Sequence, residues 1–529
     1  LPPVVFFDEN TPSPLQPQAQ NELERFEGMI VSFTGIASAA TDRFGDTAVV
    51  ASETRAFREP GIMYPGIEGL PVWDGNPEIF ELNPDGLLLD NQSLFAGQRV
   101  SATGPLGFSF GDYQVWPTEL SVGEEPDLLS PVRVKSAGET TVGALNLFRP
   151  SQIDSVYDSR LNKISQFVRN VMNAPDILAV SEVESLEVLE TVASQINSDD
   201  PSINYTAYLE EGNDIGGIDV GFLVRSYVEM DEVVQYGKDT IFDFDDSLLN
   251  DRPPLLFKGR IVENGSNFPI QVLAVHNRSL SRVDSSERVR LKRLAQAQFV
   301  AEIVQEIQSE DSNVNLVVTG DFNAYQFTDG YVDVVGQIAG TSVEADNLVW
   351  QPSPVYPELT NQVDAISAQE QYSFVFGGSA QVLDHALTSS NLSNLVTGFE
   401  YARGNADSPA SLVNNDESAL RASDHDGLVV FIQMDSDNDT VLDVVDMCEA
   451  TSVPEVTPSK GVKPNHFALL DGDIFFDTKG KSKDSFSLVD TMGCSCEQIV
   501  EQQGLGKGHI KHGCSTGVMK NWVDFVSNP

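Results

Sequence analysis

Five places in the sequence carry a polar side chain directly at the end of an apolar, strand-like run. An α/β fold builds its site where buried strands end, because side chains from several strands meet at one edge of the sheet. The side chains found here are carboxylates, carboxamides and imidazoles, which bind hard cations through oxygen or transfer protons. They are Asn146, Glu182, His276, Asp321 with Asn323, and Asp424 with His425. Their types predict a site for metal-assisted acid–base chemistry.

A further carboxylate, Asp384, lies inside the apolar run 382–388. A buried carboxylate without a partner is costly, so we expect Asp384 to pair with a second group such as His425. Asp219, in the segment GGIDVGFLVR, also lies at a strand and fits either a substrate contact or a structural role. Taken alone, His276 equally fits a hydrogen-bonded histidine at a strand end.

The elements that must position these residues alternate between strand and helix over residues 131–434. Helices are expected where apolar residues recur at helical spacing, and strands where short apolar runs occur. The expected helices are 159–172, 186–196 and 288–307, and the expected strands are 141–148, 176–180, 218–224, 270–276, 314–319, 382–388 and 427–432. This alternation predicts one large α/β catalytic domain.

The first 130 residues have a different pattern. Residues 1–25 are rich in Pro, Gln and Asn and are expected to form an extended lead-in. Residues 26–130 carry short strand-like runs at 29–35, 47–52, 98–104 and 113–119, with little helical periodicity. The segments EGMIVSFTG and GQRVSATGPLGFSFGDYQVWP suggest a small β-barrel of the oligonucleotide/oligosaccharide-binding (OB) type. Such barrels often bind single strands, and a packing or spacer role is an equal alternative.

The chain is strongly acidic, with 79 acidic and 32 basic residues and a formal net charge of −47. It repels polyanions at long range and cannot bind nucleic acid through dispersed basic surface. The acids fit a solvated surface suited to high salt, ligands for metal ions, or a small phosphate ester as the substrate. Because strong salt screens the repulsion within a few ångströms, the charge does not exclude a nuclease. Six basic residues follow His276 within 17 positions, and the first, Arg278, is a candidate for a phosphate contact.

The four cysteines, Cys448, Cys494, Cys496 and Cys514, all lie in the last 82 residues. This clustering predicts disulfides in a C-terminal module, 461–529, and an oxidising compartment; we expect a secreted protein, with the periplasm or cell surface as alternatives. Cys494 and Cys496 are too close to pair easily, which leaves two schemes that join each of them to Cys448 or Cys514. A zinc site is a weaker alternative because the C-x-C spacing is unusual. No apolar run is long enough to span a membrane, and any signal peptide is expected to have been removed.

An acidic run precedes this module within residues 435–460. In DSDNDTVLDVVD, acids stand at positions 1, 3, 5, 9 and 12 of a 12-residue loop, with Val441 at position 7, which are the ligand positions of a calcium loop. Thr440 stands where an EF-hand has Gly, and Asp446 where it has Glu. With Cys448, the run resembles the thrombospondin type 3 calcium repeats. The predicted structural Ca²⁺ ligands are Asp435, Asp437, Asp439, Val441, Asp443 and Asp446; a solvated acidic linker is the alternative.

Six segments together resemble the endonuclease/exonuclease/phosphatase superfamily. They are VGALNLF (142–148), LAVSEVES (178–185), LAVHNRSL (273–280), VVTGDFNAY (317–325), QVLDHALTSS (381–390) and ASDHDGL (422–428). Each is weak alone, but all six occur in the expected order, and GDFNA is the most specific. The order is also similar to that of secreted bacterial extracellular nucleases, which carry a barrel-like module before the catalytic domain. The resemblance implies a four-layer α/β sandwich preceded by the OB-like barrel.

The resemblance also assigns roles to the site residues. Glu182 would ligate Mg²⁺ or Mn²⁺, with Asn146 beside it and Asp424 sharing the ion; Ca²⁺ is an alternative there. Asp321 would orient or deprotonate the attacking water, with Asn323 beside it. His425, with its tautomer fixed by Asp384, would contact the phosphate. His276 would donate to a non-bridging oxygen as charge develops.

The resemblance predicts a secreted, divalent-metal-dependent phosphoesterase with no protein partner. Its substrate would be DNA or RNA, or alternatively a small phosphate ester or phospholipid head group, because the fold alone does not separate these. Two other hypotheses are a non-catalytic, calcium-dependent binding protein and an unrelated acidic structural protein. All core positions of the site are present, which argues against the first, and the second would require the six segments to be a coincidence.

Overall fold

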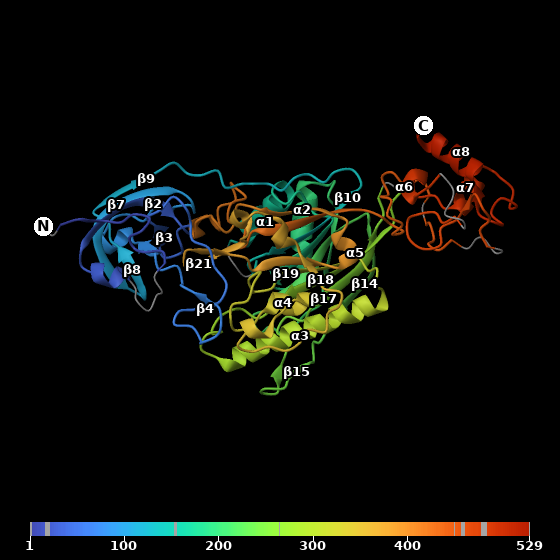
Figure 1. Cartoon of the computed structure of the whole chain (residues 1–529). Helices are drawn as coiled ribbons and strands as arrows, with labels where there is room; N and C mark the ends of the chain where they lie inside the picture. Colours follow the sequence, from blue (N-terminus) through green and yellow to red (C-terminus); the bar gives the residue numbers. More distant parts are fainter. Residues whose placement is uncertain are drawn as a thin grey trace.

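The structure is a computed structural model that describes residues 3–15, 22–152, 156–263, 265–448, 450–455, 461–477 and 484–527. Parts of the expected lead-in (16–21) and of the expected linker (456–460) lie outside the described residues. Three parts follow one another along the molecule: an N-terminal β part, a central α/β part and a small C-terminal part (Figure 1). Within the described ranges, no helix is both long and apolar enough to cross a membrane.

Five strands of the N-terminal part form a closed barrel, which confirms the small barrel expected from the sequence. The ring runs β2–β3–β6–β8–β7 and closes through β2–β7 pairing, with β6 and β8 parallel. Its strands are β2 (Ile30–Ala37), β3 (Thr47–Val50), β6 (Phe80–Leu82), β7 (Arg99–Ser109) and β8 (Asp112–Val115). Strand β1 (Val5–Phe6) adds to β2 and β9 (Glu119–Val122) to β7, so the lead-in is partly sheet. A long connection between β3 and β6, residues 51–79, carries the short strands β4 (Ile62–Met63) and β5 (Val72–Trp73).

The central part contains two six-stranded mixed sheets. The first has the order β12-β13-β11-β10-β25-β24, and the second has the order β14-β17-β18-β19-β23-β20. The strands of the first are β10 (Glu139–Asn146), β11 (Ile177–Val183), β12 (Tyr205–Leu209), β13 (Asp219–Arg225), β24 (Val396–Ala402) and β25 (Gly427–Gln433). Those of the second are β14 (Val228–Gln235), β17 (Leu255–Ile261), β18 (Phe268–His276), β19 (Leu316–Asp321), β20 (Thr360–Asn361) and β23 (Asp384–Thr388).

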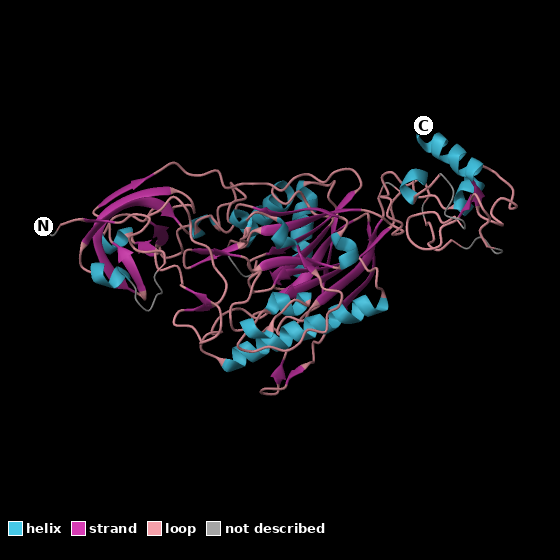
Figure 2. Ribbon diagram, in the orientation of Figure 1, coloured by secondary structure: helices cyan, strands magenta, loops and turns pink. Residues whose placement is uncertain are grey.

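Apolar residues on both faces of these strands form three separate cores. One core joins the first sheet to α1 (Tyr157–Asn170) and α2 (Leu186–Asp199). A second core lies between the two sheets, where Phe222 of β13 meets Phe257 of β17. The third joins the second sheet to α3 (Glu287–Glu310) and α4 (Val334–Ala339). The sheets therefore pack face to face with helices on their outer sides (Figure 2).

Several strand ends and loops of the central part gather at the side that faces the barrel. The most notable is a hairpin made of β21 (Phe374–Phe376) and β22 (Ser379–Gln381). Its two turn residues, Gly377 and Gly378, both have positive φ, at 54° and 83°, a conformation that glycine adopts without strain. A second small hairpin, β15 (Ile241–Phe242) with β16 (Ser247–Leu248), lies beside α3.

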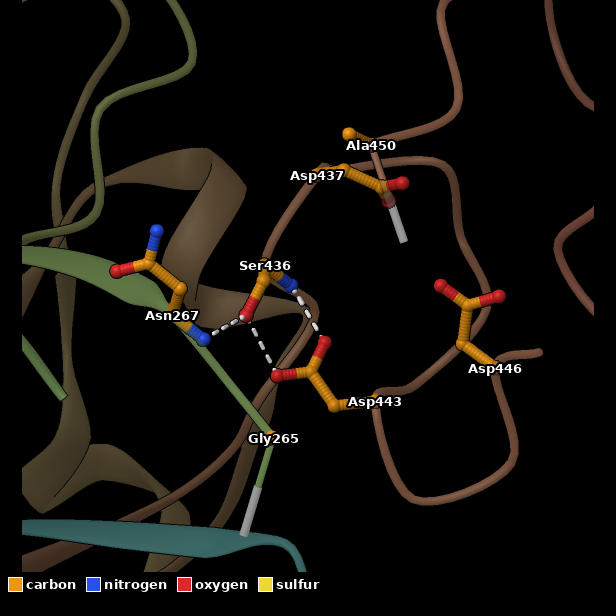
Figure 3. A pocket seen from close by; sticks show the side chains of 7 residues that line it. All are labelled: Gly265, Asn267, Ser436, Asp437, Asp443, Asp446 and Ala450. Atoms are coloured by element: carbon orange, nitrogen blue, oxygen red, sulfur yellow. Dashed lines mark hydrogen bonds between the residues drawn. The ribbon is translucent and has the colours of Figure 1, made fainter. Parts of the chain in front are cut away.

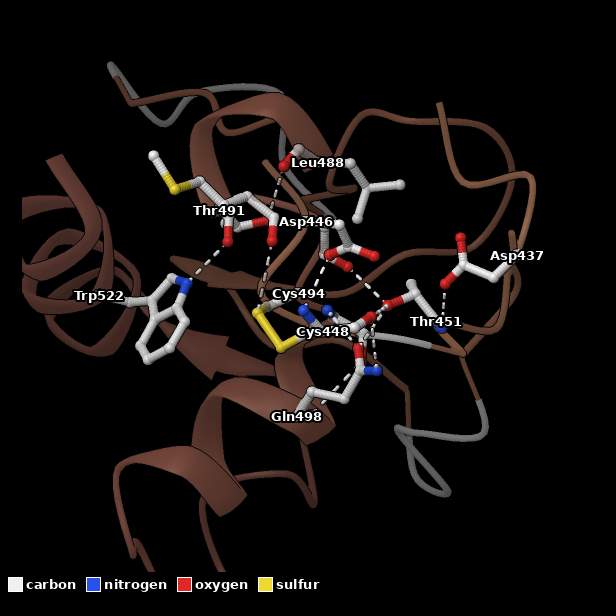
Figure 4. Close-up of a disulfide and its surroundings, with 12 residues drawn as sticks. Asp437, Asp446, Cys448, Thr451, Leu488, Thr491, Cys494, Gln498 and Trp522 are labelled. Carbon is white, nitrogen blue, oxygen red and sulfur yellow. Dashed lines mark hydrogen bonds between the residues drawn. A yellow bond between two sulfur atoms is a disulfide. The ribbon is translucent and has the colours of Figure 1, made fainter. Parts of the chain in front are cut away.

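The C-terminal part is held by two disulfides, Cys448–Cys494 and Cys496–Cys514. This is one of the two pairings that the spacing left open, and it removes all four sulfurs as zinc ligands. Around them pack α6 (Leu488–Thr491), α7 (Cys496–Gln502), α8 (Thr516–Ser527) and the strand pair β26 (His466–Phe467) and β27 (Cys514–Ser515). Figure 4 shows Asp446 of the acidic run close to Cys448, to whose backbone N–H it is bonded, and Asp437 next to Thr451. Val441 is buried in this core, so the run 435–446 is part of the packed unit.

Candidate active site

A cavity of about 700 Å³ brings together side chains from both six-stranded sheets. Glu182 comes from β11 of the first sheet, whereas His276 and Asp321 come from β18 and β19 of the second. The loop before β25 contributes two more residues. The structure therefore gathers six of the predicted residues in the wall of one cavity: Glu182, His276, Asp321, Asn323, Asp424 and His425.

Three polar residues lie side by side on neighbouring strands of the second sheet. His276 ends β18, Asp321 ends β19 and Asp384 begins β23. The ladder pairs His276 with Asp321 and Asp321 with Asp384. The Nε2 atom of His276 is 3.5 Å from Oδ2 of Asp321. Strand register thus places an imidazole and two carboxylates in one row at the edge of the sheet.

Asp384 and His425 form the acid–histidine pair expected from the cost of a buried carboxylate. Nδ1 of His425 lies 2.7 Å from Oδ2 of Asp384. Burial opposes the charged imidazolium, but the negative charge of Asp384 and this hydrogen bond outweigh it, so the pKa of His425 lies well above its ordinary value. His425 is therefore protonated near neutral pH and can donate a hydrogen bond to a phosphate oxygen.

Residues that were not singled out in the sequence hold this pair in place. The hydroxyl of Ser373 donates to Oδ2 of Asp384 at 2.7 Å, and the Phe374 ring lies 4.6 Å from the His425 ring. Asn405 donates to the carbonyl of His425. Ser373 and Phe374 stand at the base of the β21–β22 hairpin, so the hairpin contacts the acid–histidine pair directly.

Asp321 is fixed by three groups on three different segments. Its Oδ1 accepts from the backbone N–H of Asn323 at 2.8 Å, and its Oδ2 accepts from Asn146 at 3.3 Å and faces His276. Burial raises the pKa of Asp321 to about 7, although the positive charge of His425 opposes the shift. A carboxylate with this pKa can accept a proton from water near neutral pH.

Glu182 and Asp424 bring two carboxylates to the same cavity. Glu182 has φ of 57°, and the pairing of β11 with β13 shifts between Val180 and Val183. Such a bulge redirects a side chain, here from the sheet into the cavity. Burial and then the negative charge of Asp424 raise the pKa of Glu182. A cation between the two carboxylates would remove this repulsion.

His276 is buried and neutral. Burial lowers its pKa well below the ordinary value, and the positive charges of Arg252 and His425 act in the same direction. Its Nδ1 atom has no hydrogen-bond partner among the described residues. Arg252, which the sequence did not single out, lines the cavity and donates to the carbonyls of His276 and Asn277. It thereby fixes the backbone that follows β18.

Asp219 and Arg278 are the two predicted substrate contacts. Asp219 accepts from the backbone N–H of Gly212 at 2.8 Å, and burial raises its pKa to about 7. Neither Asp219 nor Arg278 is among the described residues that line the cavity, where Arg252 and Arg282 are the arginines present. The carbonyls of Arg278 and Asn323 both accept from Arg293, a fully buried residue of α3. Arg278 thus contributes to the site through its backbone.

Two sets of residues in this region offer ligands for a metal ion. One is Glu182 with Asp424. The other is Asp321, Asp384 and His425, whose ligand atoms lie within 4.8 Å of one another. In the second set His425 and Asp384 already use their nearest atoms for a hydrogen bond to each other. Glu182 and Asp424 are therefore the better candidates.

The acidic run 435–446 offers another group of ligands. Carboxylate oxygens of Asp435, Asp437 and Asp439 lie within 4.8 Å of one another. Asp439 is 2% exposed, and its Oδ2 atom has no partner among the described residues. Asp437, Asp443 and Asp446 line an adjoining cavity of about 280 Å³, in which Ser436 donates to Asp443 (Figure 3).

Comparison with solved structures found matches that each cover slightly more than half of this chain. Truncated TDP2 from Caenorhabditis elegans is 16% identical, covers 56% of this chain with 98% of its own, and has a TM-score of 0.37. An endonuclease/exonuclease/phosphatase from Bacteroides vulgatus is 15% identical, with coverages of 56% and 99% and a TM-score of 0.39. The catalytic domain of human nocturnin with bound sulfate is 16% identical, with coverages of 57% and 97% and a TM-score of 0.36.

Comparison with curated proteins found no match. Residues 8–127 match a domain of unknown function, DUF8508, which spans the barrel and the 51–79 connection. Residues 151–418, slightly more than half of the chain, match the model of the endonuclease/exonuclease/phosphatase family. The matched range contains Glu182, His276, Asp321 and Asp384. The chain belongs to the endonuclease/exonuclease/phosphatase family.

Proposed function

We propose that this protein is a secreted, divalent-metal-dependent phosphoesterase that hydrolyses phosphodiester bonds of DNA or RNA. The observation that carries the proposal is the meeting of the Asp384–His425 pair, Asp321 and the Glu182–Asp424 carboxylates around one cavity. These groups supply a proton acceptor, a cationic hydrogen-bond donor and oxygen ligands for a hard cation. Each of these groups can accelerate the hydrolysis of a phosphate ester.

The residues of the cavity fit a divalent cation. Glu182 and Asp424 point their like charges at the same space, and the charge of Asp424 raises the pKa of Glu182. Two carboxylates with an open face suit Mg²⁺ or Mn²⁺, which keep several waters beside few protein ligands. When bound, the ion would polarise the phosphate and stabilise the leaving oxygen. Asn146, whose side chain is hydrogen-bonded to Asp321 and also to Glu182, would lie beside the ion.

The remaining residues have complementary roles. Asp321 takes the proton of the attacking water, and Asn323 holds its carboxylate through the backbone. His425, kept protonated by Asp384, donates to a phosphate oxygen. His276 is neutral and offers a second donor as negative charge develops on the phosphate. Arg252 fixes the segment that follows β18.

The aromatic lining of the cavity favours a nucleic acid as the substrate. Three aromatic residues, Tyr325, Phe374 and Phe376, line it, and aromatic rings stack on unpaired bases. The small-ester alternative is favoured by the net charge of −47, which repels a polyanion at low salt. Two disulfides are typical of a secreted protein. Strong salt outside the cell would screen the repulsion between this charge and a polyanion.

The test is hydrolysis of linear DNA, circular plasmid, RNA and bis-p-nitrophenyl phosphate with Mg²⁺, Mn²⁺, Ca²⁺ or EDTA, at low and high salt. Metal-dependent degradation of the polymers is expected, with higher activity at high salt. Cleavage of the small ester alone would select the alternative substrate class. A folded protein that cleaves nothing with any of these ions would refute the proposed function.

We also propose that the acidic run 435–446 binds one structural Ca²⁺. The support is the convergence of Asp435, Asp437 and Asp439, together with the buried and unpartnered Oδ2 of Asp439. A cation there would pair that oxygen and remove the repulsion among the carboxylates. The carbonyl of Val441 and the carboxylates of Asp443 and Asp446 would complete the ligand set.

A further inference from the structure

The tip of the β21–β22 hairpin is inserted against the N-terminal barrel. A Cβ atom on Gly378 would lie 2.9 Å from Ala48 of β3 and from Ile79 at the end of the 51–79 connection. The hydroxyl of Ser38, which follows β2 and is fully buried, donates to the carbonyl of Gly378 at 2.6 Å. The same hydroxyl accepts from the N–H of Ala56 at 3.2 Å. One barrel side chain thus joins the hairpin turn to the 51–79 connection.

The 51–79 connection pairs with the hairpin through backbone and side chains. The N–H of Arg58 donates to the carbonyl of Ala380 and the N–H of Ala380 donates to the carbonyl of Ala56, each at 2.9 Å. Asn76 donates to the hydroxyl of Ser379 at 2.7 Å and to the carbonyl of Phe57 at 3.0 Å. One edge of strand β22 is therefore hydrogen-bonded to the 51–79 connection of the N-terminal part.

The same connection supports a second wall of the cavity. The guanidinium of Arg58 lies between two aromatic rings, 3.9 Å from the centroid of Trp73 and 4.5 Å from that of Tyr325. Tyr325 follows the GDFNA segment and lines the cavity, whereas Trp73 belongs to the connection. A desolvated cation between two rings is a favourable contact. Arg58 thus links the N-terminal part to the loop that carries Asp321 and Asn323.

The hairpin also contacts the active site. Its strand β21 carries Phe374 against the His425 ring and Phe376 into the cavity wall, and Ser373 before it bonds Asp384. Phe376 is 72% exposed, so few contacts of its own hold it. The position of this aromatic wall depends on the turn at the far end, which contacts the barrel.

We propose that the N-terminal barrel and its 51–79 connection hold the active-site hairpin in its substrate-binding position, with Ser38, Arg58 and Asn76 as positioning residues. Without these contacts the hairpin would occupy the binding position for only a fraction of the time. The apparent affinity for substrate falls in proportion to that fraction, whereas turnover of bound substrate does not. The barrel would then set KM without touching the reacting atoms. This proposal rests on the proposed hydrolysis for its kinetic readout.

The test compares Ser38→Ala, Asn76→Gly and the double variant with wild type in the full chain. Glycine is chosen at position 76 because Asn76 has φ of 51°. The matched control is Ser93→Ala, which removes a hydrogen bond between Ser93 of the barrel part and Ser411 that does not involve the hairpin. The measurements are kcat and KM for the best ester at saturating Mg²⁺, the thermal midpoint, and hydrogen exchange of residues 373–381.

Loss of one buried hydrogen bond is expected to raise KM about five- to tenfold, more in the double variant, with kcat within about twofold of wild type. Exchange of 373–381 should accelerate in the same variants and not in Ser93→Ala. A lower folded fraction alone would reduce kcat and leave KM unchanged, so that result overturns the proposal, as does an unaltered KM with kcat intact. If wild type hydrolyses no ester, the proposed function has failed, and hydrogen exchange alone tests the role of the barrel. Accelerated exchange of residues 373–381 in the Ser38 and Asn76 variants would then support that role. Unaltered exchange would overturn it.

Discussion

The hydroxyl of Ser373 and Nδ1 of His425 both lie 2.7 Å from the same oxygen, Oδ2 of Asp384. This oxygen therefore accepts two hydrogen bonds, one of them charged, and the carboxylate cannot rotate without losing both. The bond from His425 fixes the tautomer of the imidazole, and the bond from Ser373 holds the carboxylate that orients it.

The first prediction concerns this pair. Asp384→Asn keeps the size of the side chain but removes the charge that holds His425 protonated, so kcat should fall by about 10²–10⁴-fold, the range of general acid–base contributions. Steady-state hydrolysis of DNA measures it. Asp231→Asn, at an exposed ion pair with Arg260 on the far edge of the second sheet, is the control and should retain full activity. Equal activity of the two variants would remove Asp384 from the mechanism.

The second prediction concerns the cation. Glu182→Gln replaces one of the two cavity carboxylates, so the Mg²⁺ concentration for half-maximal activity should rise by about 10–100-fold, while EDTA should abolish activity of wild type. A metal titration of both proteins is the measurement. Glu184→Gln, two residues further along the chain, serves as the matched variant because Glu184 is not among the described residues of the cavity wall. A Glu182→Gln enzyme with an unaltered metal requirement would place the ion elsewhere.

The third prediction concerns the pH dependence of hydrolysis. Burial raises the pKa of Asp321 to about 7, and the proposed base acts only when deprotonated. The value of kcat/KM should therefore rise with pH and level off above about pH 7. A rise of this kind could come from a protein carboxylate or from metal-bound water, and pH profiles recorded with Mg²⁺ and with Mn²⁺ separate the two. If the rise has the same midpoint pH with both metals, a protein carboxylate is responsible. If the midpoint pH changes with the metal, the group is metal-bound water.

The fourth prediction concerns the acidic run. Burial raises the pKa of Asp439 to about 8 and those of Asp435 and Asp446 to about 6. Because these folded-state values exceed the unfolded ones, the stability they contribute is present at low pH and is lost as pH rises from about 4 to about 8. Calcium should reverse this loss, so it should raise the unfolding midpoint of the C-terminal part by several degrees at pH 8 and much less at pH 5.

Thermal unfolding in calcium or EDTA at both pH values checks this prediction. Asp439→Asn should reduce both the calcium response and the pH slope, because it removes the most strongly buried of these charges. Asp471→Asn, an exposed residue of the same part, should change neither. Identical midpoints with and without calcium at pH 8 would contradict the site.

Much of the site could be predicted from local pattern. Apolar strand runs end at Asn146, His276 and Asp321, and the structure brings these strand ends together. The cost of burying a carboxylate predicted that Asp384 has a partner, and the family resemblance indicated His425. Both inferences depend on the spacing of apolar residues and on the cost of burying a charge, which can be judged from a single sequence. The six segments in their order, of which GDFNA is the most specific, indicated the family.

Other residues of the site could not be predicted because no local sequence pattern marks them. Phe374 begins a three-residue strand before a Gly-Gly turn, which is too short to show a period, and Ser373 directly precedes that strand. Arg252 acts through backbone carbonyls on another strand. The bond between Ser38 and Gly378 joins residues 340 positions apart, and neither position has an unusual composition. Arg278 was singled out for its charge, but the contact that the structure shows uses its carbonyl.

The row formed by His276, Asp321 and Asp384 depends on the register of three strands. Side chains alternate between the two faces of a sheet, so moving β19 by one residue would turn Asp321 away and present Gly320 or Phe322 in its place. Such a shift would leave the composition of the core nearly unchanged and abolish the site. Insertions or deletions of a single residue in β18, β19 or β23 should therefore be far more harmful to activity than most substitutions in them.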